Sequence, residues 1–348
     1  MHYRIVAVIL LFAISLTDSH AQDFHYSQFG NAPLHLNPGL TGVFNGNVRL
    51  QGNFRNQWSS VPVDYLTFRA AVDKKFQACR ADKSNFWAAG LALNYDRAGD
   101  GNLSWFDLNL NGSYTQYLSN GFFVTLGGQI AGVQRRFDED ELRFGDQFNG
   151  NNPLNPTSEQ FGRTSNFFLD FSLGLNFRWQ AYDRASRYDY KDKRSKVDVG
   201  VALFHIAEPE QTFIEDDDVP LYRRLSVYGL GVVQLSNPLD IVLGVTGQFQ
   251  GPYREYVGMG GVRLHLNRKP GKQISLQGNL GIRFNDFTDA WFPQVQLQYN
   301  DLQVGLSYDI NVSDFDVATN GRGGPEVSLR YIFKRVCPVP SRRFCPII

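Results

Sequence analysis

The chain has 348 residues, of which 43% are hydrophobic and 14% aromatic, and its formal net charge at pH 7 is zero. That length suits two soluble domains or one large barrel, and a neutral chain has no global field to attract nucleic acid. After the N-terminus no apolar run approaches the ~18 residues that a membrane helix needs, which excludes a helical membrane protein. A strand-based membrane protein is not excluded, because its strands place only every second residue on lipid.

The N-terminus has the pattern of a secretory signal peptide. Arg4 supplies a positive charge, Ile5 to Leu16 form an apolar core of 12 residues, and Ser19 and Ala21 are the small residues of a cleavage site before Gln22. A membrane anchor would need a longer apolar core. We therefore expect residues 1–21 to be removed near Ala21/Gln22 and the mature protein to be exported.

Residues 22–46 follow as an irregular stretch with Asn-Pro-Gly and Thr-Gly turns. This segment is expected to lie in the periplasm or to plug the lumen of a barrel.

From residue 47 to residue 333 the chain repeats about ten residues of strict alternation followed by a turn. In 167–179 the even-numbered positions include Asp170, Ser172 and Asn176, and the odd positions are apolar. A period of two over such a length predicts a strand. The apolar positions are Phe167, Leu169, Phe171, Leu173, Leu175, Phe177 and Trp179.

Fourteen such segments are expected, and an even number suits a single-chain barrel. They are 47–57, 64–75, 85–97, 103–118, 121–137, 166–179, 196–206, 221–235, 239–250, 253–266, 273–284, 289–300, 301–312 and 325–333.

A soluble β-sandwich is the alternative to a membrane barrel. Soluble strands average about five or six residues, roughly half the length expected here. Polar faces with Asp, Asn, Gln and Arg also suit an enclosed lumen better than one dry core. The predicted fold class is thus all-β, a transmembrane antiparallel up-and-down β-barrel of about 14 strands.

The lengths of the connections supply a second criterion. If the mature N-terminus is periplasmic, the tight turns at 119–121, 236–238 and 300–301 are periplasmic, and the long connections 138–165, 207–220 and 313–324 are external. The connection 180–195 is long on the periplasmic side. It is either a solvated turn or a docking surface for a periplasmic partner.

No catalytic constellation is present in the sequence. None of the six His residues lies in a zinc-binding pattern, and neither a nucleophile elbow nor a phosphate-binding loop occurs. His205 is the only candidate for a lipid-modifying enzyme, and the acidic run 215–218 lacks the ligand spacing of a calcium site. We expect no enzyme, no cofactor and no metal.

The three cysteines are expected on the periplasmic side, an oxidising compartment. Cys337 and Cys345 could close a small disulfide loop, or Cys79 could pair with one of them and attach the tail to the barrel. The basic, Pro-containing residues 334–348 follow the last strand and are expected to form a periplasmic tail.

Several motifs together resemble the PorP/SprF family of type IX secretion system outer-membrane proteins. No single motif is specific, but their order and spacing are. Gly39 departs from the family, which usually has Ala there, and the Cys-bearing tail departs too. The motifs are Gln28-Phe29, Leu36-Asn37-Pro38-Gly39-Leu40-Thr41-Gly42, Phe54-Arg55-Asn56-Gln57-Trp58, Val201 to His205 with Pro209 and Thr212-Phe213, Val304 to Asn311 including Tyr308 and Asp309, and Gly324 to Tyr331 including Glu326.

These motifs are first interpreted as scaffold. Arg55 and Asn56 are expected to hydrogen-bond within the lumen, and Trp58 to join an external aromatic girdle. Tyr308 is expected on the lipid or girdle side, with Asp309 and Asn311 facing inward. Because the first and thirteenth strands lie near each other once a barrel closes, Arg55 and Asp309 are expected to form an ion pair.

The resemblance implies a component of type IX secretion, acting in protein secretion, gliding motility or adhesion. Its partners would be outer-membrane lipid and either a secreted surface adhesin, the favoured partner, or the periplasmic ring proteins. The main alternative is an outer-membrane channel or transporter for small solutes.

Overall fold

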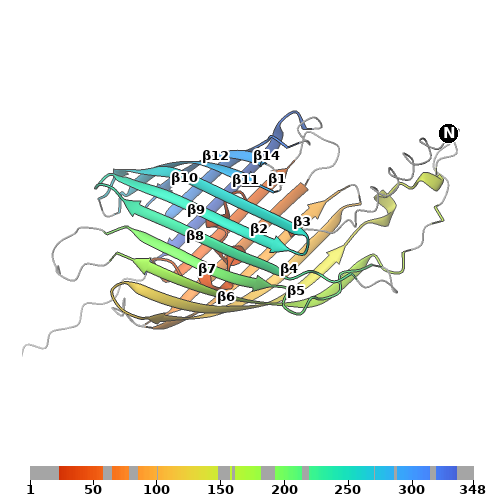
Figure 1. Cartoon of the computed structure of the whole chain (residues 1–348), viewed down its shortest axis with the longest axis horizontal. Coiled ribbons are helices and arrows are strands. Elements are labelled where there is room, and N and C mark those ends of the chain that lie inside the picture. Colours follow the sequence, from red (N-terminus) through yellow and green to blue (C-terminus); the bar gives the residue numbers. More distant parts are fainter. Residues whose placement is uncertain are drawn as a thin grey trace, which may run out of the picture.

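The computed structural model describes residues 23–57, 65–77, 85–99, 101–147, 157–158, 161–181, 193–213, 219–269, 271–285, 288–313 and 319–334. Fourteen antiparallel strands close into one barrel, in which each strand pairs with its neighbours in sequence and β1 pairs with β14 (Figure 1). The strands are β1 (Val48–Gln57), β2 (Tyr65–Phe76), β3 (Phe86–Ala98), β4 (Leu103–Tyr117), β5 (Phe122–Arg136), β6 (Ser165–Gln180), β7 (Lys196–Phe204), β8 (Arg224–Gln234), β9 (Leu239–Gln250), β10 (Tyr253–Asn267), β11 (Ile274–Phe284), β12 (Thr288–Tyr299), β13 (Leu302–Asn311) and β14 (Arg322–Phe333).

The predicted strand count and topology are confirmed. Every predicted segment corresponds to one strand, and the largest boundary differences are at the starts of β8 and β14. The residues before β8 instead form a loop, in which Pro220 makes an isolated bridge with Glu210.

Alternation along the strands sorts polar side chains inward and apolar side chains outward. In β6, Leu169 is 54% exposed on the outer surface, whereas Asp170 and Ser172 are buried in the lumen. The outward positions at mid-height in this strand carry no charge, and outward Lys74 lies near the end of β2. Such a surface suits the hydrocarbon layer of an outer membrane.

The two rims of the barrel differ. The proximal rim is where β1 begins and β14 ends, and it carries tight turns such as 118–121 and 300–301. The distal rim, on the right in Figure 1, carries the connection 137–164 with η3 (Glu139–Glu141) and η4 (Gly145–Gln147), and the connection 205–223. The longest proximal connection, 181–195, joins β6 to β7, where the sequence predicted a long periplasmic connection at 180–195.

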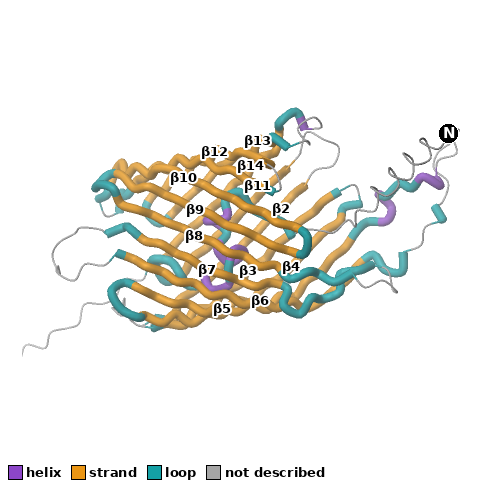
Figure 2. Tube along the Cα trace, in the orientation of Figure 1, coloured by secondary structure: helices purple, strands orange, loops and turns teal. Residues whose placement is uncertain are grey.

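Residues 23–47, here called the plug, cross the lumen. They contain η1 (Phe29–Asn31), α2 (Pro33–Leu36) and η2 (Pro38–Leu40), which lie inside the ring of strands (Figure 2). Among the described residues no helix is long and apolar enough to span a membrane. The main apolar core lies between plug and wall and consists of Phe29, Leu36, Leu40, Val43, Tyr228, Val257 and Phe292.

The direction of the plug corrects one premise of the sequence analysis. Asp23 hydrogen-bonds Gln250 at the distal end of β9, whereas the Asn47 N–H donates to the Phe333 carbonyl at the proximal rim, 2.8 Å away. The first described residue is therefore at the distal end, not at the rim where β1 begins. Alternation within strands carries no information about an irregular segment that enters the lumen from the other side.

Candidate functional site

The plug is fastened at its distal end by a chain of charged groups around Asp23. His205 directly follows β7, and its Nε2 lies 2.7 Å from Asp23 while its Nδ1 lies 2.9 Å from Asp170 of β6. Arg224 at the start of β8 approaches the same Asp23 carboxylate at 3.2 Å. All these groups are sheltered from solvent, so the bonds are charge-assisted in a low-dielectric setting. We call this set the distal anchor.

Two opposing effects set the ionisation of the distal anchor. Burial alone would lower the pKa of His205, but the carboxylates of Asp23 and Asp170 raise it to about 9. Burial would likewise raise the pKa of Asp23, yet His205 and Arg224 hold it below its usual value. At neutral pH the imidazole is therefore a cation bridging two carboxylates.

This ionisation predicts that the distal anchor weakens in alkali. A group whose pKa is raised on folding stabilises fully below its unfolded value of 6.5, and that contribution, at most about 3 kcal/mol, is lost as pH rises through about 9. The hydrogen-exchange rate of residues 23–28 should thus rise more between pH 7 and pH 10 in the wild-type protein than in the variant His205→Asn. Asn tolerates the left-handed backbone of position 205, where φ is 54°. Identical pH profiles for the two proteins would disprove the role of His205.

A second set of contacts, the central cluster, lies deeper in the lumen. Asp309 of β13 accepts from Nη2 of Arg55 at 2.6 Å and also from Arg283 of β11. The Ser27 hydroxyl donates to Asp309 at 2.7 Å, and the Ser27 backbone N–H donates to Glu326 of β14 at 2.8 Å. The expected Arg55–Asp309 ion pair is present, but it belongs to a larger group that includes the plug.

Gln28 ties the plug to three neighbouring strands. Its side-chain amide donates to Ser307 of β13 at 3.0 Å and to the Glu326 carbonyl of β14 at 2.9 Å. Its side-chain oxygen Oε1 accepts from Gln294 of β12 at 3.0 Å and from Ser328 of β14 at 2.7 Å. Because the amide donors and the oxygen of the Gln28 side chain all have partners on the wall, this part of the plug is held in place by several hydrogen bonds at once.

The opposite wall holds the plug through Asn37. Its amide donates to the carbonyls of Leu175 and Val201, at 3.0 and 3.1 Å, and its oxygen accepts from the Gly39 N–H at 2.6 Å. Two wall residues that the plug touches here are glycines, which have no side chain. A Cβ added to lumen-facing Gly174 of β6 would lie 1.8 Å from the Asn37 oxygen, and one on its cross-strand partner Gly127 of β5 would lie 2.4 Å from Pro38.

We expect Gly174→Val to displace the plug while leaving the barrel intact. Valine suits a strand, but its side chain would occupy the space of the Asn37 amide, an overpacking that costs about 1–3 kcal/mol. Limited proteolysis should cut within 30–45 in this variant and not in wild type. Gly112→Val is the matched control because a Cβ there meets nothing within 4 Å. Equal resistance of both variants would contradict the close contact.

At the proximal end the plug is held by a buried ion pair. Arg49 of β1 and Asp73 of β2 bond through two nitrogen–oxygen contacts of 2.9 and 2.8 Å. Asp73 also accepts from the Gly42 N–H at 2.7 Å, and Lys75 donates to the Phe44 carbonyl. The plug is therefore anchored at both ends and in the middle.

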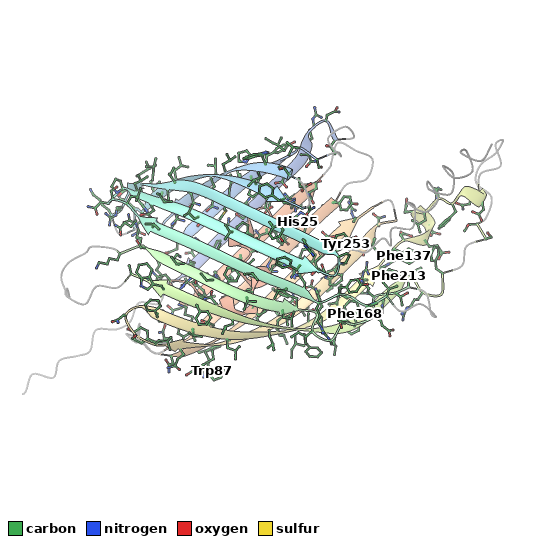
Figure 3. The ribbon with its side chains drawn as sticks, viewed as in Figure 1. His25, Trp87, Phe137, Phe168, Phe213 and Tyr253 are labelled. Atoms are coloured by element: carbon green, nitrogen blue, oxygen red, sulfur yellow. The ribbon has the colours of Figure 1, made fainter. Side chains whose placement is uncertain are left out.

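Cavities remain above and below the plug. The distal cavity, about 510 Å³, is lined by residues of the plug, including Asp23 and His25, and by wall residues such as Trp105 and Tyr253. Figure 3 shows His25 and Tyr253 within the barrel toward its distal side. Two proximal cavities of about 300 and 310 Å³ adjoin each other beneath the plug.

The structure brings most of the family-motif residues of the sequence analysis to the lumen or the distal rim. Tyr308 faces outward and is 41% exposed, whereas Asp309 and Asn311 are buried inside, as expected. Gln57 lines the distal cavity. The Pro209 carbonyl accepts from the Leu221 N–H within the distal connection 205–223. Pro38, in η2, packs close to Gly127.

Phe213 belongs to an aromatic cluster on the distal side. Its ring meets Phe137 edge to face with centroids 4.8 Å apart, and Phe137 meets Phe161 in the same way at 5.0 Å. The Arg135 guanidinium lies over the Phe213 ring, 5.7 Å from its centroid. Figure 3 shows Phe137 and Phe213 side by side at this end, and Trp87 pointing outward near the other.

One expected lumen contact is absent. Asn56 shares the parity of outward Phe54, so its side chain leaves the lumen side that Arg55 occupies, and its buried oxygen has no partner among the described residues. Successive residues of a strand point to opposite faces, so both could not reach the lumen. Trp58, Cys79, Cys337, Cys345 and the acidic run 215–218 lie outside the described residues.

Other residues of the anchors were not recognised as a site from the sequence. Asp170 and Arg283 are visible as polar positions in alternating strands, but nothing local reveals that they meet the plug. Asp23, Ser27 and Asp73 are inconspicuous polar residues in sequence. Only the barrel's closure and the path of the plug bring them together.

Comparison with known proteins gives the family. The model of the type IX secretion system membrane protein PorP/SprF matches residues 18–331. A search of curated proteins found no significant match.

Solved outer-membrane barrels are similar at very low identity. The TodX deltaS2S3 mutant monoaromatic hydrocarbon channel shares 10% identity at a TM-score of 0.48, with 87% of this chain and 95% of that one covered. The translocator domain of autotransporter NalP from Neisseria meningitidis shares 9% at 0.34, with 88% and 96% covered. At such scores these likenesses add nothing to the fold described above. Because the family model spans most of the sequence, the chain belongs to the PorP/SprF family of type IX secretion system membrane proteins.

Proposed function

We propose that this protein is a sealed outer-membrane partner of type IX secretion, which holds or helps to export a secreted surface adhesin. The observation that carries the proposal is the plug, which crosses the lumen and is anchored to the wall at both ends and in the middle. A barrel of fourteen strands is near the size at which a channel would otherwise remain. A chain that fills this lumen with its own residues suits a scaffold better than a solute pore.

The orientation follows from the rims. Outer-membrane barrels have short periplasmic turns and long external loops. The distal rim carries the two longest connections, 137–164 and 205–223, and is therefore assigned to the cell exterior, and the proximal rim to the periplasm. In this assignment residues 1–21 are removed near Ala21/Gln22, the segment 22–46 supplies the plug, 47–333 form the barrel and 334–348 form a periplasmic tail.

The distal rim is the surface that we assign to the adhesin. It carries the long connections, the aromatic cluster of Phe213 and a cavity of about 510 Å³. A role in the periplasmic ring is the second candidate, and it would use the proximal rim.

An enzymatic role gains no support from His205. Both of its ring nitrogens lie within hydrogen-bonding distance of carboxylates, so neither is available to a substrate. The geometry of this histidine fits an anchor for the plug.

Deleting the gene in its native cells tests the proposal. We expect a surface adhesin to disappear from the cell exterior and to accumulate inside, while uptake of small solutes is unchanged. Complementation with the wild-type gene should restore the adhesin. Impaired solute uptake with a normal cell surface would instead establish the channel. General failure of type IX secretion, with all its cargo retained, would point to the ring.

A further inference from the structure

The proximal cavities carry an excess of positive charge. They adjoin beneath the plug and share part of their lining, and together we call them the proximal chamber. The residues that line both cavities are Asn45, Arg178, Lys196, Val232, Arg263, Gln298 and Lys334. Among the described residues no Asp or Glu lines the cavity nearer the rim, which instead includes Lys193, Arg194, His265 and Arg268.

Some of these cations are neutralised by the barrel itself. Arg178 pairs with Asp198 at 2.7 Å, and Arg194 pairs with Asp240 at 2.8 Å. Lys334 lies 2.5 Å from Asp301. Arg178, Arg194 and Lys334 are thus each neutralised by a carboxylate of the barrel.

Three further cations have no such partner. Within the described part of the chain, no carboxylate lies at ion-pairing distance from Lys196, Arg263 or Arg330. Arg263 donates to the neutral amide oxygen of Gln277 at 2.8 Å, and Arg330 donates to that of Gln303. Asp240 stands opposite Arg263 in the register of β9 and β10, and Asp198 lies two positions from Lys196 in β7, but these carboxylates are bonded at closer range to Arg194 and Arg178. All three cations are partly withdrawn from solvent, where an incompletely compensated charge is costly.

We propose that the proximal chamber binds an acidic peptide segment of a periplasmic protein. The three cations come from β7, β10 and β14, and β7 and β14 stand on opposite sides of the closed barrel. A chain bearing several carboxylates can meet cations on opposed walls, whereas a compact anion meets one wall. Cavities of about 300 and 310 Å³ also hold more than a single phosphate.

The chemistry of the remaining lining agrees with a peptide. Gln180, Gln273 and Gln298 supply amide donors and acceptors that match a peptide backbone. Membrane phosphates would have to leave the bilayer and enter the lumen through the rim. The proposal rests on the orientation given under the proposed function, in which the proximal rim faces the periplasm.

Binding of a fluorescent hexaglutamate peptide to the purified full-length chain in neutral detergent tests the proposal. We expect saturable binding that weakens with salt, and no binding of hexaglutamine. The triple variant Lys196→Gln, Arg263→Gln and Arg330→Gln should bind at least tenfold more weakly. It should remain folded, because it removes unpaired charges. Lys196→Gln alone, at the first residue of β7, should show a smaller loss and serves as a check in case the triple variant misfolds.

Arg136→Gln is the matched control, because Arg136 is an exposed cation of the distal rim. It should leave hexaglutamate affinity unchanged. Undiminished binding by the triple variant would overturn the proposal. So would displacement of hexaglutamate by inorganic phosphate at equal total charge, which would mark a compact anion site. The binding assay uses purified protein and is independent of the gene deletion. If the peptide does not bind but the deletion still removes the adhesin from the cell surface, only this inference is rejected. If the peptide binds but the deletion leaves the adhesin in place, only the adhesin role is rejected.

Discussion

Deleting residues 24–44 should raise the ion conductance of the barrel at least tenfold. The plug contributes buried side chains that meet the inner wall, including Gln28 and Asn37. Without it, a fourteen-stranded barrel retains a wide polar interior that water can fill. In planar bilayers we expect wild type to stay near the baseline and the deletion to give steady openings at least tenfold larger.

The deletion also strips the central cluster of Ser27, so its folding must be checked by heat-modified mobility on gels. Gly174→Val supplies an independent test, because it keeps the whole chain and only pushes the plug from the wall. It should conduct intermittently, while Gly112→Val should behave as wild type. A wild-type chain that conducts as strongly as the deletion would refute the idea of a sealed lumen.

Asp309→Asn should strongly destabilise the barrel. Asp309 is 1% exposed and neutralises Arg55 while also bonding Arg283. Removing its charge leaves Arg55 with only Glu326, at 3.9 Å, and Arg283 with only the partly exposed Asp289, at 3.6 Å. Breaking a buried pair costs about 3–5 kcal/mol, and these longer contacts should keep the loss near the lower value. The midpoint of urea unfolding in detergent should fall accordingly. Asp301→Asn, which removes a partly exposed pair with Lys334, should cost less than about 1 kcal/mol.

Asp309 bonds both Arg55 and Arg283, so a simple exchange of the Arg55 and Asp309 charges does not isolate their interaction. Exchanging the two charges places an arginine at position 309 beside Arg283, so the exchange should rescue folding only in part. A double-mutant cycle of Arg55→Gln and Asp309→Asn avoids that repulsion. We expect the double variant to lose about 1–3 kcal/mol less than the sum of the single losses. Strict additivity would mean that the two residues do not interact.

Much of the wall could be predicted because its rules are local. Alternation in 167–179 identifies a strand and says which residues face lipid, and the tight turn at 119–121 separates two strands without any tertiary information. Closure of an even-numbered barrel then brings the first and thirteenth strands together. That argument was enough to predict Arg55 opposite Asp309, and to place Tyr308 on the outside.

The anchors could not be predicted in this way. Gln28 bonds to residues about 270 to 300 positions away, and Asp23 meets His205 across 182 positions. An irregular segment has no periodicity that fixes its direction, so the sequence left open whether residues 22–46 lie in the periplasm or plug the lumen, and from which rim they would enter. The expectation that Asn56 hydrogen-bonds in the lumen is wrong, because Arg55 points into the lumen and successive residues of a strand point to opposite faces.

By itself, the sequence determines a fourteen-stranded barrel with a lipid-facing exterior and a polar lumen, since a two-residue period is a property of each strand alone. Only the tertiary structure decides what fills that lumen. The plug's position depends on side chains from both ends of the chain meeting inside a closed wall, and their distances are set by strand register and shear. The tertiary structure likewise shows that Lys196, Arg263 and Arg330 line one chamber. The sequence could not predict this, because which cations lack an ion-pair partner depends on the contacts of all the others.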